Sequence, residues 1–460
     1  MKSLLSLLIL TSLFISSGWT ESLPEIDNQP HFPTSGKRLL PFNEKTTLGA
    51  YRKVGSHNPK WDKDAETALS IYARFLTGQE AVFGTTNMTK MVNCFSNAVA
   101  HGCDDPLIQY AAVRLRQHGI VLHNTEELGV YKSVLAGLEK HCYPANRQCL
   151  MYERALECLL KKIPLNDEQN ALGKTWMETA MSQLPFWVND DVDRNGIYET
   201  AGCILQNYLG VGGDRKEGYD LLHAYMEKIV TNKTVVPRVI AASYYREWGW
   251  QARGSGYSDS VTETKAKLFE ERLTKAKEIL EEAWKQDQTD PFICKQLMDI
   301  AGSIGSPDEM DLWFRRGKKV DPAYYALYLC QLHYLHPQWY GSEEEMINFG
   351  RKCLTEGNWN GLIPFILIAV HDEGENSRFG YLRKPEVWKD VEEVYETYLK
   401  KYPKNNMQKS AYCFHAVKAE KWDLAKRLMD ELGEFTVYHA FEGKVAFCRA
   451  EIQKHIPTKN

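Results

Sequence analysis

The chain has 460 residues, of which 43% are apolar and 25% are charged, and its formal net charge is −4. This is an ordinary globular composition with acidic and basic residues interspersed, and without a basic stripe we expect no nucleic-acid partner. A single hydrophobic core rarely grows beyond about 250–300 residues. The chain therefore forms either several domains or a stack of repeats that bury their apolar faces on one another.

The N-terminus has the features of a secretory signal peptide over residues 1–20. Lys2 is followed by an apolar run from Leu4 to Ile15, and small residues suited to cleavage follow at Gly18. The run is shorter than the about 20 residues needed to cross a bilayer, and no later segment is apolar enough to do so. We therefore expect a secreted or periplasmic protein without a transmembrane segment.

Helices are predicted along almost all of the remaining chain. Residues 21–60 contain several prolines and few apolar clusters, which predicts an extended or disordered lead. Apolar residues then recur at helical spacing, and no stretch alternates long enough for a confident strand. The fold class is therefore all-α, with an N-terminal helical repeat region over 61–258 and a C-terminal one over 259–460. The helices expected in the first region include Asp64–Thr77, Thr89–His101, Pro106–His118, Asn124–His141, Gln148–Lys162, Asp167–Leu184, Ile197–Leu209, Lys216–Asn232 and Arg238–Arg253.

From Ala283 onward the helices are predicted to come in pairs. Short breakers separate them, among them Asp290-Pro291 and Asp321-Pro322, and the spacing of about 31–45 residues is that of helix-pair repeats. This pattern predicts an α-solenoid of stacked helical hairpins. The third pair is interrupted by an expected insertion over 372–385. The predicted pairs are Phe292–Gly302 with Asp308–Val320, Ala323–Leu335 with Ser342–Glu356, Trp359–His371 with Glu386–Tyr402, and Met407–Ala419 with Trp422–Leu432.

The C-terminal pairs resemble tetratricopeptide repeats. Ala416, Trp422 and Ala425 stand at small-large-small positions in the last pair, and Pro322 and Pro403 stand where that family ends a unit. The family's Trp-Leu-Gly-Tyr signature is absent. The resemblance covers about the last 40% of the chain and implies a binding scaffold.

Two further segments are similar to an uncharacterised family of bacterial exported proteins that carry a domain of unknown function. They are the loop from Trp248 to Tyr257 and the segment from His336 to Met346. This resemblance implies a helical-repeat module in an exported protein and implies no established activity.

The segment from Asp191 to Gly196 matches the first six positions of a calcium-binding loop, with alternating oxygen side chains and a glycine at the sharp turn. The twelfth position should be a bidentate glutamate and is Gly202. The alternative is a polar turn that caps a helix beginning near Ile197. Calcium is the one cofactor that the sequence suggests, and its candidate ligands are Asp191, Asp193, Asn195 and Glu199.

Two aromatic loops are candidates for ligand binding. In the first, tryptophans and an arginine lie among glycines, so that the guanidinium of Arg253 could bind a carboxylate. The alternative for this loop is a tight turn between helices in which the rings pack. The second loop runs from His336 to Ser342, and the alternative for it is that Ser342 caps the following helix. The candidate ligand-binding residues are Trp248, Trp250, Arg253, Tyr257 and Trp339.

Eleven cysteines in an exported chain suggest disulfides. We expect one or two in the N-terminal half, led by Cys94–Cys103 and Cys142–Cys149. The alternative is that the cysteines are small buried apolar residues.

These features favour a binding scaffold over an enzyme. We expect an exported helical-repeat protein that binds a protein or peptide partner in the cell envelope or extracellular space. The alternative is a helical-repeat enzyme acting on polysaccharide or peptidoglycan, which would need two carboxylates within about 5–10 Å in a deep cleft. No residue set in the sequence locates such a pair.

Overall fold

The computed structural model of the protein describes residues 34–77, 85–116, 126–161, 164–256, 261–433 and 436–456. Within these ranges the chain forms α-helices and short 3-10 helices and no β-strand, so the predicted all-α stack of helical hairpins is confirmed. No helix in these ranges is both long and apolar enough to cross a membrane. The expected signal peptide lies outside the described residues.

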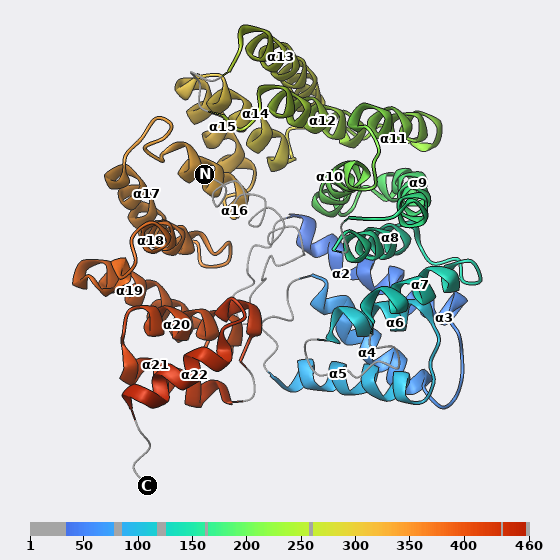
Figure 1. Cartoon of the computed structure of the whole chain (residues 1–460), viewed down its shortest axis with the longest axis horizontal. Helices are drawn as coiled ribbons and strands as arrows, with labels where there is room; N and C mark the ends of the chain where they lie inside the picture. Colours follow the sequence, from blue (N-terminus) through green and yellow to red (C-terminus); the bar gives the residue numbers. More distant parts are fainter. Residues whose placement is uncertain are drawn as a thin grey trace. The chain divides into compact units, whose positions relative to one another are not determined.

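The described residues form two compact units, one of residues 34–77 and 89–320 and the other of residues 85–88 and 321–456. The helices of the first unit are labelled in Figure 1. They are α2 (Thr34–Thr46), α3 (Leu48–Val54), α4 (Asp62–Phe75), α5 (Thr85–Ala100), α6 (Pro106–Arg114), α7 (Glu127–Leu138), α8 (Ala145–Leu160), α9 (Asp167–Asp190), α10 (Arg194–Gly210), α11 (Arg215–Ile229), α12 (Val236–Arg253), α13 (Glu263–Gln286), α14 (Pro291–Ser303) and α15 (Pro307–Val320).

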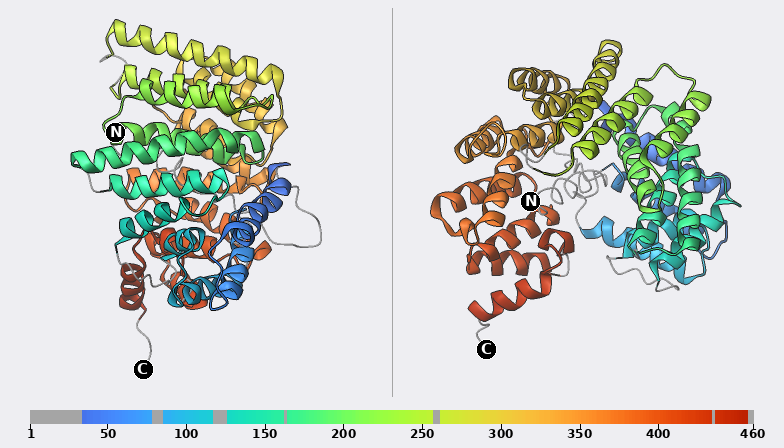
Figure 2. Two further views of the ribbon diagram at one scale, coloured as in Figure 1. Left: turned by 90° about the vertical axis from the view of Figure 1, so that its right-hand side faces the viewer. Right: turned by 45° about the horizontal axis from the view of Figure 1, so that its top comes forward.

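Each helix of the first unit packs on the next one along the chain, from α6 to α15. Alternate helices also touch, so that α8 contacts α10, α10 contacts α12, and α9 contacts α11. Figure 2 shows the helices from α8 to α13 lying side by side as successive layers. A two-layer stack of this kind is the arrangement expected of helical-hairpin repeats.

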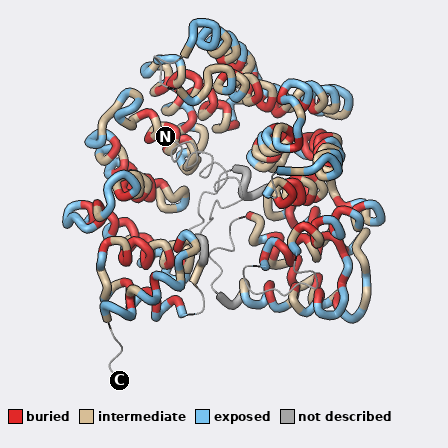
Figure 3. The backbone as a smooth tube through the Cα atoms, viewed as in Figure 1, coloured by how far each residue is buried: buried red, intermediate tan, exposed pale blue. Residues whose placement is uncertain are grey.

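Apolar burial follows these contacts. Buried residues gather where neighbouring helices of a unit face one another, and exposed residues line the outer faces (Figure 3). In α8, for example, Met151, Leu156 and Leu159 are almost completely buried. Each such side chain stabilises the fold by about 1.5–3 kcal/mol relative to exposure.

Part of the expected extended lead is helical. Helices α2 and α3 cover most of residues 34–54, although Pro41 lies inside α2. The burial of Phe42 and Tyr51 offsets the backbone hydrogen bond that Pro41 removes. The lead therefore does not include these residues, while its first part, residues 21–33, lies outside the described residues.

Proline also fails to end α9 where the sequence predicted. The helix was expected to stop at Leu184, and it instead continues through Pro185 to Asp190. Trp187 and Val188, in the added turn, are almost completely buried. Tertiary packing thus outweighs the loss of one backbone hydrogen bond.

The boundary expected at residue 258 falls inside the first unit. Helices α12 and α13 on either side of it pack against each other. A Cβ atom at Gly249 would lie 2.5 Å from a methyl group of Leu273, so glycine is what allows these two helices to approach.

The second unit contains α16 (Tyr325–Tyr334), α17 (Glu343–Glu356), α18 (Ile366–Ser377), α19 (Pro385–Lys401), α20 (Asn406–Lys418), α21 (Trp422–Leu432) and α22 (Val445–His455), with 3-10 turns η4 (Ile363–Phe365), η5 (Tyr381–Arg383) and η7 (Tyr438–Phe441). The predicted pairs α14–α15, α18–α19 and α20–α21 are confirmed by their packing, whereas α17 packs mainly on α18 and η4 rather than on α16, with which it was expected to pair. The expected insertion over 372–385 is corrected, because its first residues continue α18.

A buried arginine ties the beginning of the described chain to α8. The side chain of Arg147 is almost completely buried, and burial lowers its pKa. It forms no ion pair within the described part of the chain. Instead it donates to Thr46 Oγ1 at 2.8 Å and to Asn43 Oδ1 at 2.6 Å, both on α2. Neutral acceptors on α2 therefore satisfy a buried charge on α8.

Replacing Asn43 with alanine leaves one guanidinium N–H of Arg147 buried without its acceptor. We expect Asn43→Ala to lower the free energy of unfolding by about 1–3 kcal/mol, measured by urea denaturation. Glu44→Ala, at an exposed position on the same helix, is the matched control and should change stability by less than about 0.5 kcal/mol. Equal effects of the two substitutions would contradict this role for Asn43.

Candidate functional site

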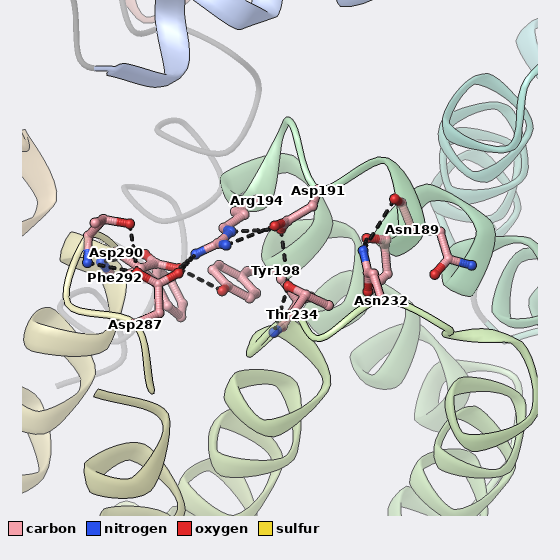
Figure 4. A network of polar contacts seen from close by, with 12 residues as sticks. Asn189, Asp191, Arg194, Tyr198, Asn232, Thr234, Asp287, Asp290 and Phe292 are labelled. Carbon is pink, nitrogen blue, oxygen red and sulfur yellow. Dashed lines mark hydrogen bonds and ion pairs between the residues drawn. The ribbon is translucent and has the colours of Figure 1, made fainter. Parts of the chain in front are cut away.

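The calcium-like segment takes part in a polar network around Arg194, the first residue of α10 (Figure 4). The guanidinium of Arg194 binds both carboxylate oxygens of Asp191, at 2.7 and 2.9 Å, and also Asp287 at 2.7 Å. Asp290 accepts from Tyr198 at 2.7 Å and caps α14 through the N–H of Phe292. The network thus joins the α9–α10 turn to the loop between α13 and α14.

Three of the four candidate calcium ligands have separate roles in this geometry, and the fourth, Asn195, is the exposed second residue of α10. Asp191 ends α9 in the left-handed conformation, at φ 47°, and is paired with Arg194. Asp193 caps α10 by accepting from the N–H of Gly196 at 3.1 Å. Glu199 lies within α10, where burial and the neighbouring Asp193 raise its pKa. Among the described residues, no three acidic, histidine or cysteine side chains are placed to hold a metal ion.

The polar turn that caps a helix, the alternative to the calcium loop, accounts for these contacts. The helix begins at Arg194, three residues before the position expected from the sequence. Calcium binding by this segment stays a prediction, and the contacts of Asp191 do not support it because a guanidinium occupies both of its oxygens.

The ring of Trp248 belongs to a stack that joins three helices. It stacks on Tyr244 with centroids 5.5 Å apart, and Tyr244 in turn stacks on Tyr219 of α11 at 3.9 Å. The guanidinium of Arg272, on α13, lies 3.5 Å from the centre of the Trp248 ring and donates to the Trp248 carbonyl. Trp248 therefore contributes to packing between α11, α12 and α13.

Trp250 and Arg253, like Trp248, lie in the last turns of α12 and not in the loop expected from the sequence, and they also make contacts within the hairpin. The ring of Trp250 meets Phe269 edge to face at 4.9 Å, and the guanidinium of Arg253 lies 5.4 Å from the Trp250 ring. Arg253 donates to the carbonyl of Gly256 at 3.0 Å. Tyr257 lies outside the described residues. The ligand-binding role of these residues stays a prediction.

Trp339 belongs to the second unit, in the segment that follows α16. Its ring contacts His333 at 5.4 Å and Tyr334 at 5.3 Å. Ser342 caps α17 by accepting from the N–H of Glu345, as the sequence indicated. Tyr340, beside Trp339, is 43% exposed and is the more accessible ring.

The expected disulfides do not form in this structure, where Cys94, Cys103, Cys142 and Cys149 are free thiols. Cys142 is exposed, whereas Cys149 on α8 is fully buried and its Sγ donates to the carbonyl of Ala180. Burial raises the pKa of Cys103 to about 12, so its thiolate is scarce at neutral pH. Cys103 and Cys149 thus behave as small buried side chains.

The second unit contains an open groove along α19 and α21. Its volume is about 450 Å³, and Leu428, which is buried, and the half-buried Leu399 supply its apolar part. Asn405 fixes the turn before α20 by capping that helix at Gln408. The lining residues are Glu396, Thr397, Leu399, Lys400, Pro403, Lys409, Arg427, Leu428 and Glu431.

Most charged groups of the groove are already paired. Lys409 binds Glu431 at 2.8 Å, and Arg427 binds Glu396 at 3.3 Å. Lys400 makes no ion pair with any described residue. The spacing of Arg427 and Glu431 fits one helix face, but nothing in the sequence brings Glu396 of α19 beside Arg427. Sequence reasoning therefore missed the groove.

Two buried histidine–aspartate pairs hold α18 against its neighbours. His371 Nε2 lies 3.1 Å from Asp390 of α19, and burial lowers the pKa of His371. His415 of α20 faces Asp372 with Nε2 at 2.9 Å and the carbonyl of Ala411 with Nδ1 at 2.8 Å. Both ring nitrogens of His415 face acceptor oxygens, an arrangement that favours the protonated ring. Asp372 raises the pKa of His415 even though burial opposes it.

Glu373, next to the second pair, is a carboxyl group in an unfavourable position. No described residue donates a hydrogen bond to its buried Oε2 atom. Burial, and then the charge of Asp372, raise the pKa of Glu373 to about 7. Ionisation of Glu373 at neutral pH therefore opposes folding of this unit.

A search of models of known protein families finds no match to this chain. A search of curated proteins also finds none. Among solved structures, the human IFIT1 dimer with m7Gppp-AAAA is similar, with a TM-score of 0.36 and 12% identity over 80% of this chain and 72% of that one. A monomeric IFIT1 mutant with m7Gppp-AAAA has a TM-score of 0.34 and 13% identity over 85% of this chain and 76% of that one. At these values neither likeness bears on function.

Replacing Arg194 with alanine removes the shared partner of Asp191 and Asp287. We expect Arg194→Ala to lower the free energy of unfolding by about 2–3 kcal/mol in urea, because partly buried carboxylates lose their charged donor. The control is Arg315→Ala, which breaks an exposed pair with Asp311 and should cost less than about 0.5 kcal/mol. A loss no larger than that of the control would mean that the network does not hold the loops.

Replacing Glu373 with glutamine should stabilise the protein only at higher pH. The folded-state pKa of about 7 lies above the model value of 4.5, so the cost of ionising Glu373 is absent below pH 4.5, grows as the pH rises and is complete above pH 7. We expect Glu373→Gln to raise the free energy of unfolding by about 1–2 kcal/mol at pH 8. This is less than the whole pKa shift would give, because the residue is partly exposed and solvent screens its charge. At pH 5 the gain should nearly vanish.

Thermal melting at the two pH values measures this difference. Glu392→Gln, at an exposed position on α19, is the control and should show no such pH dependence. An equal gain for Glu373→Gln at pH 5 and pH 8 would show that ionisation is not its cause.

Proposed function

We propose that the protein is a helical-repeat scaffold that binds a protein or peptide partner through the groove along α19 and α21. The observation that carries the proposal is the groove itself, which combines an apolar part with charged residues on an open surface. Apolar contacts supply affinity in such a site, and the charged groups restrict which partner fits.

The charges of the groove support binding over catalysis. The carboxylates of Glu396 and Glu431 are each paired with a cation. Tyr412 also donates to Glu396, at 3.2 Å. Neither carboxylate is therefore available as the free acid or base that hydrolysis of a glycosidic bond needs. Lys400 remains available for an acidic group of the partner.

The proposed location is the cell envelope or the extracellular space. This part rests on the N-terminal sequence alone, where a positive residue, an apolar run and small residues follow one another.

Peptides selected from a displayed random library on the immobilised full-length protein provide the probe for the groove. We expect Arg427→Ala to weaken the selected peptide about tenfold or more by fluorescence polarisation, since central arginines often dominate such interfaces. Lys426→Ala is the matched control, because it changes the neighbouring residue on α21, which pairs with Asp430 and does not line the groove. Affinities that are equal for wild type and both variants would place binding elsewhere.

A further inference from the structure

A serine and a histidine that are far apart in the sequence meet in the first unit. Ser56 follows α3, and His141 lies between α7 and α8. The Oγ atom of Ser56 is 3.2 Å from Nε2 of His141. This is the contact expected between a nucleophile and its general base.

The hydrogen bond of Nδ1 determines the role of Nε2 in the His141 ring. Nδ1 of His141 lies within hydrogen-bond distance of the backbone carbonyl of Val54, which can only accept. In the neutral ring Nδ1 therefore carries the proton, and Nε2 presents its lone pair to the Ser56 hydroxyl. The Val54 carbonyl thus orients the base, as a third group does in known nucleophile–base pairs.

The backbone of Ser56 is held on both sides. Its N–H donates to Asp105 Oδ2 at 2.9 Å, and its carbonyl accepts from Trp61 Nε1 at 2.9 Å. Asp105 is completely buried and also accepts from Tyr143 at 2.8 Å. Asp105 and Trp61 are therefore positioning residues that hold the Ser56 backbone before any ligand arrives, and Tyr143 acts through Asp105.

Gly55 and the backbone N–H of His57 complete the arrangement. A Cβ atom at Gly55 would lie 2.5 Å from the Tyr51 ring, so only glycine lets the chain turn this closely before Ser56. No hydrogen bond within the described residues uses the backbone N–H of His57. The N–H of the residue after the nucleophile is a usual donor to the oxyanion in acyl transfer.

We propose that Ser56 and His141 form a catalytic pair that hydrolyses a small acyl ester. Both side chains are half-buried, and the adjoining residues His57, Lys140 and Cys142 are exposed, so the pair lies near the surface of the first unit. This activity is independent of the groove on the second unit.

In the first step Ser56 Oγ forms a bond to the carbonyl carbon of the ester while Nε2 of His141 takes the hydroxyl proton. The bond to the leaving alcohol then breaks, and His141 returns the proton to that alcohol. In the second step water attacks the acyl group on Ser56, and His141 takes a proton from the water. The carboxylic acid leaves, and Ser56 regains its proton from His141.

A fluorophosphonate probe tests the nucleophile on the full-length wild-type protein. We expect mass spectrometry of the digested protein to find one phosphonyl group on the peptide that contains Ser56. This measurement needs no variant, so it does not depend on whether a substitution folds. An unlabelled Ser56 in the folded protein would overturn the proposal.

Hydrolysis of p-nitrophenyl acetate tests the pair. We expect Ser56→Ala to lower kcat/KM by about a hundredfold or more, and His141→Ala to do the same. Added imidazole should restore part of the activity of His141→Ala and none of that of Ser56→Ala, which a merely structural role for His141 would not produce. Ser133→Ala, at an exposed position on α7, is the control and should keep full activity. Wild-type rates in Ser56→Ala, or no effect of imidazole, would overturn the proposal.

Discussion

The structure depends on the burial of helices against their neighbours along the chain. A single amphipathic helix cannot remove its apolar face from water, and in the first unit the contacts between consecutive and alternate helices do this repeatedly. Large rings fill the spaces between helices, as in the stack of Tyr219, Tyr244 and Trp248. In the first unit, stability is thus spread over many successive helix interfaces.

Polar side chains fix the connections that apolar packing leaves free. Arg194 joins two loops through three aspartates. Asp105 caps α6, accepts from the Ser56 N–H after α3, and accepts from the Tyr143 hydroxyl after α7. Because these groups are partly or fully removed from water, each unpaired donor or acceptor would be costly. The same contacts therefore set the geometry of the loops, where binding and chemistry usually take place.

The two proposed activities arise from different parts of this arrangement. The groove on the second unit is a surface between helices, and its charged residues pair with one another around an apolar strip. The Ser56–His141 contact is made between two loops whose backbones are held by buried groups. A helical-repeat scaffold can contain both sites, because each helix packs only on its neighbours and the loops between helices can differ in sequence from one hairpin to the next.

The sequence predicted helix ends well where a capping residue, a proline or a glycine lies within a few residues of the end. Asp290 and Pro291 begin α14, Ser342 caps α17, and Gly357 ends it in the left-handed conformation. The same reasoning erred at Pro41 and Pro185, where both helices continue because burial of neighbouring rings outweighs one lost hydrogen bond. The cysteines that were expected to pair are free thiols, and the burial of Cys103 and Cys149 is not visible in their spacing.

The sequence by itself determined the helical class, the hairpin repeat and most helix boundaries, because these follow from periodicity and from caps within a few residues. Only the tertiary structure decided which distant side chains meet. His141 lies 85 residues from Ser56 and Arg427 lies 31 from Glu396, and both contacts depend on how the helices stack. The turn from Asp191 to Gly196 shows the same limit. Its spacing resembles a calcium loop, but Asp191 is paired with Arg194 at the start of α10, and the same guanidinium also binds Asp287 from a distant loop.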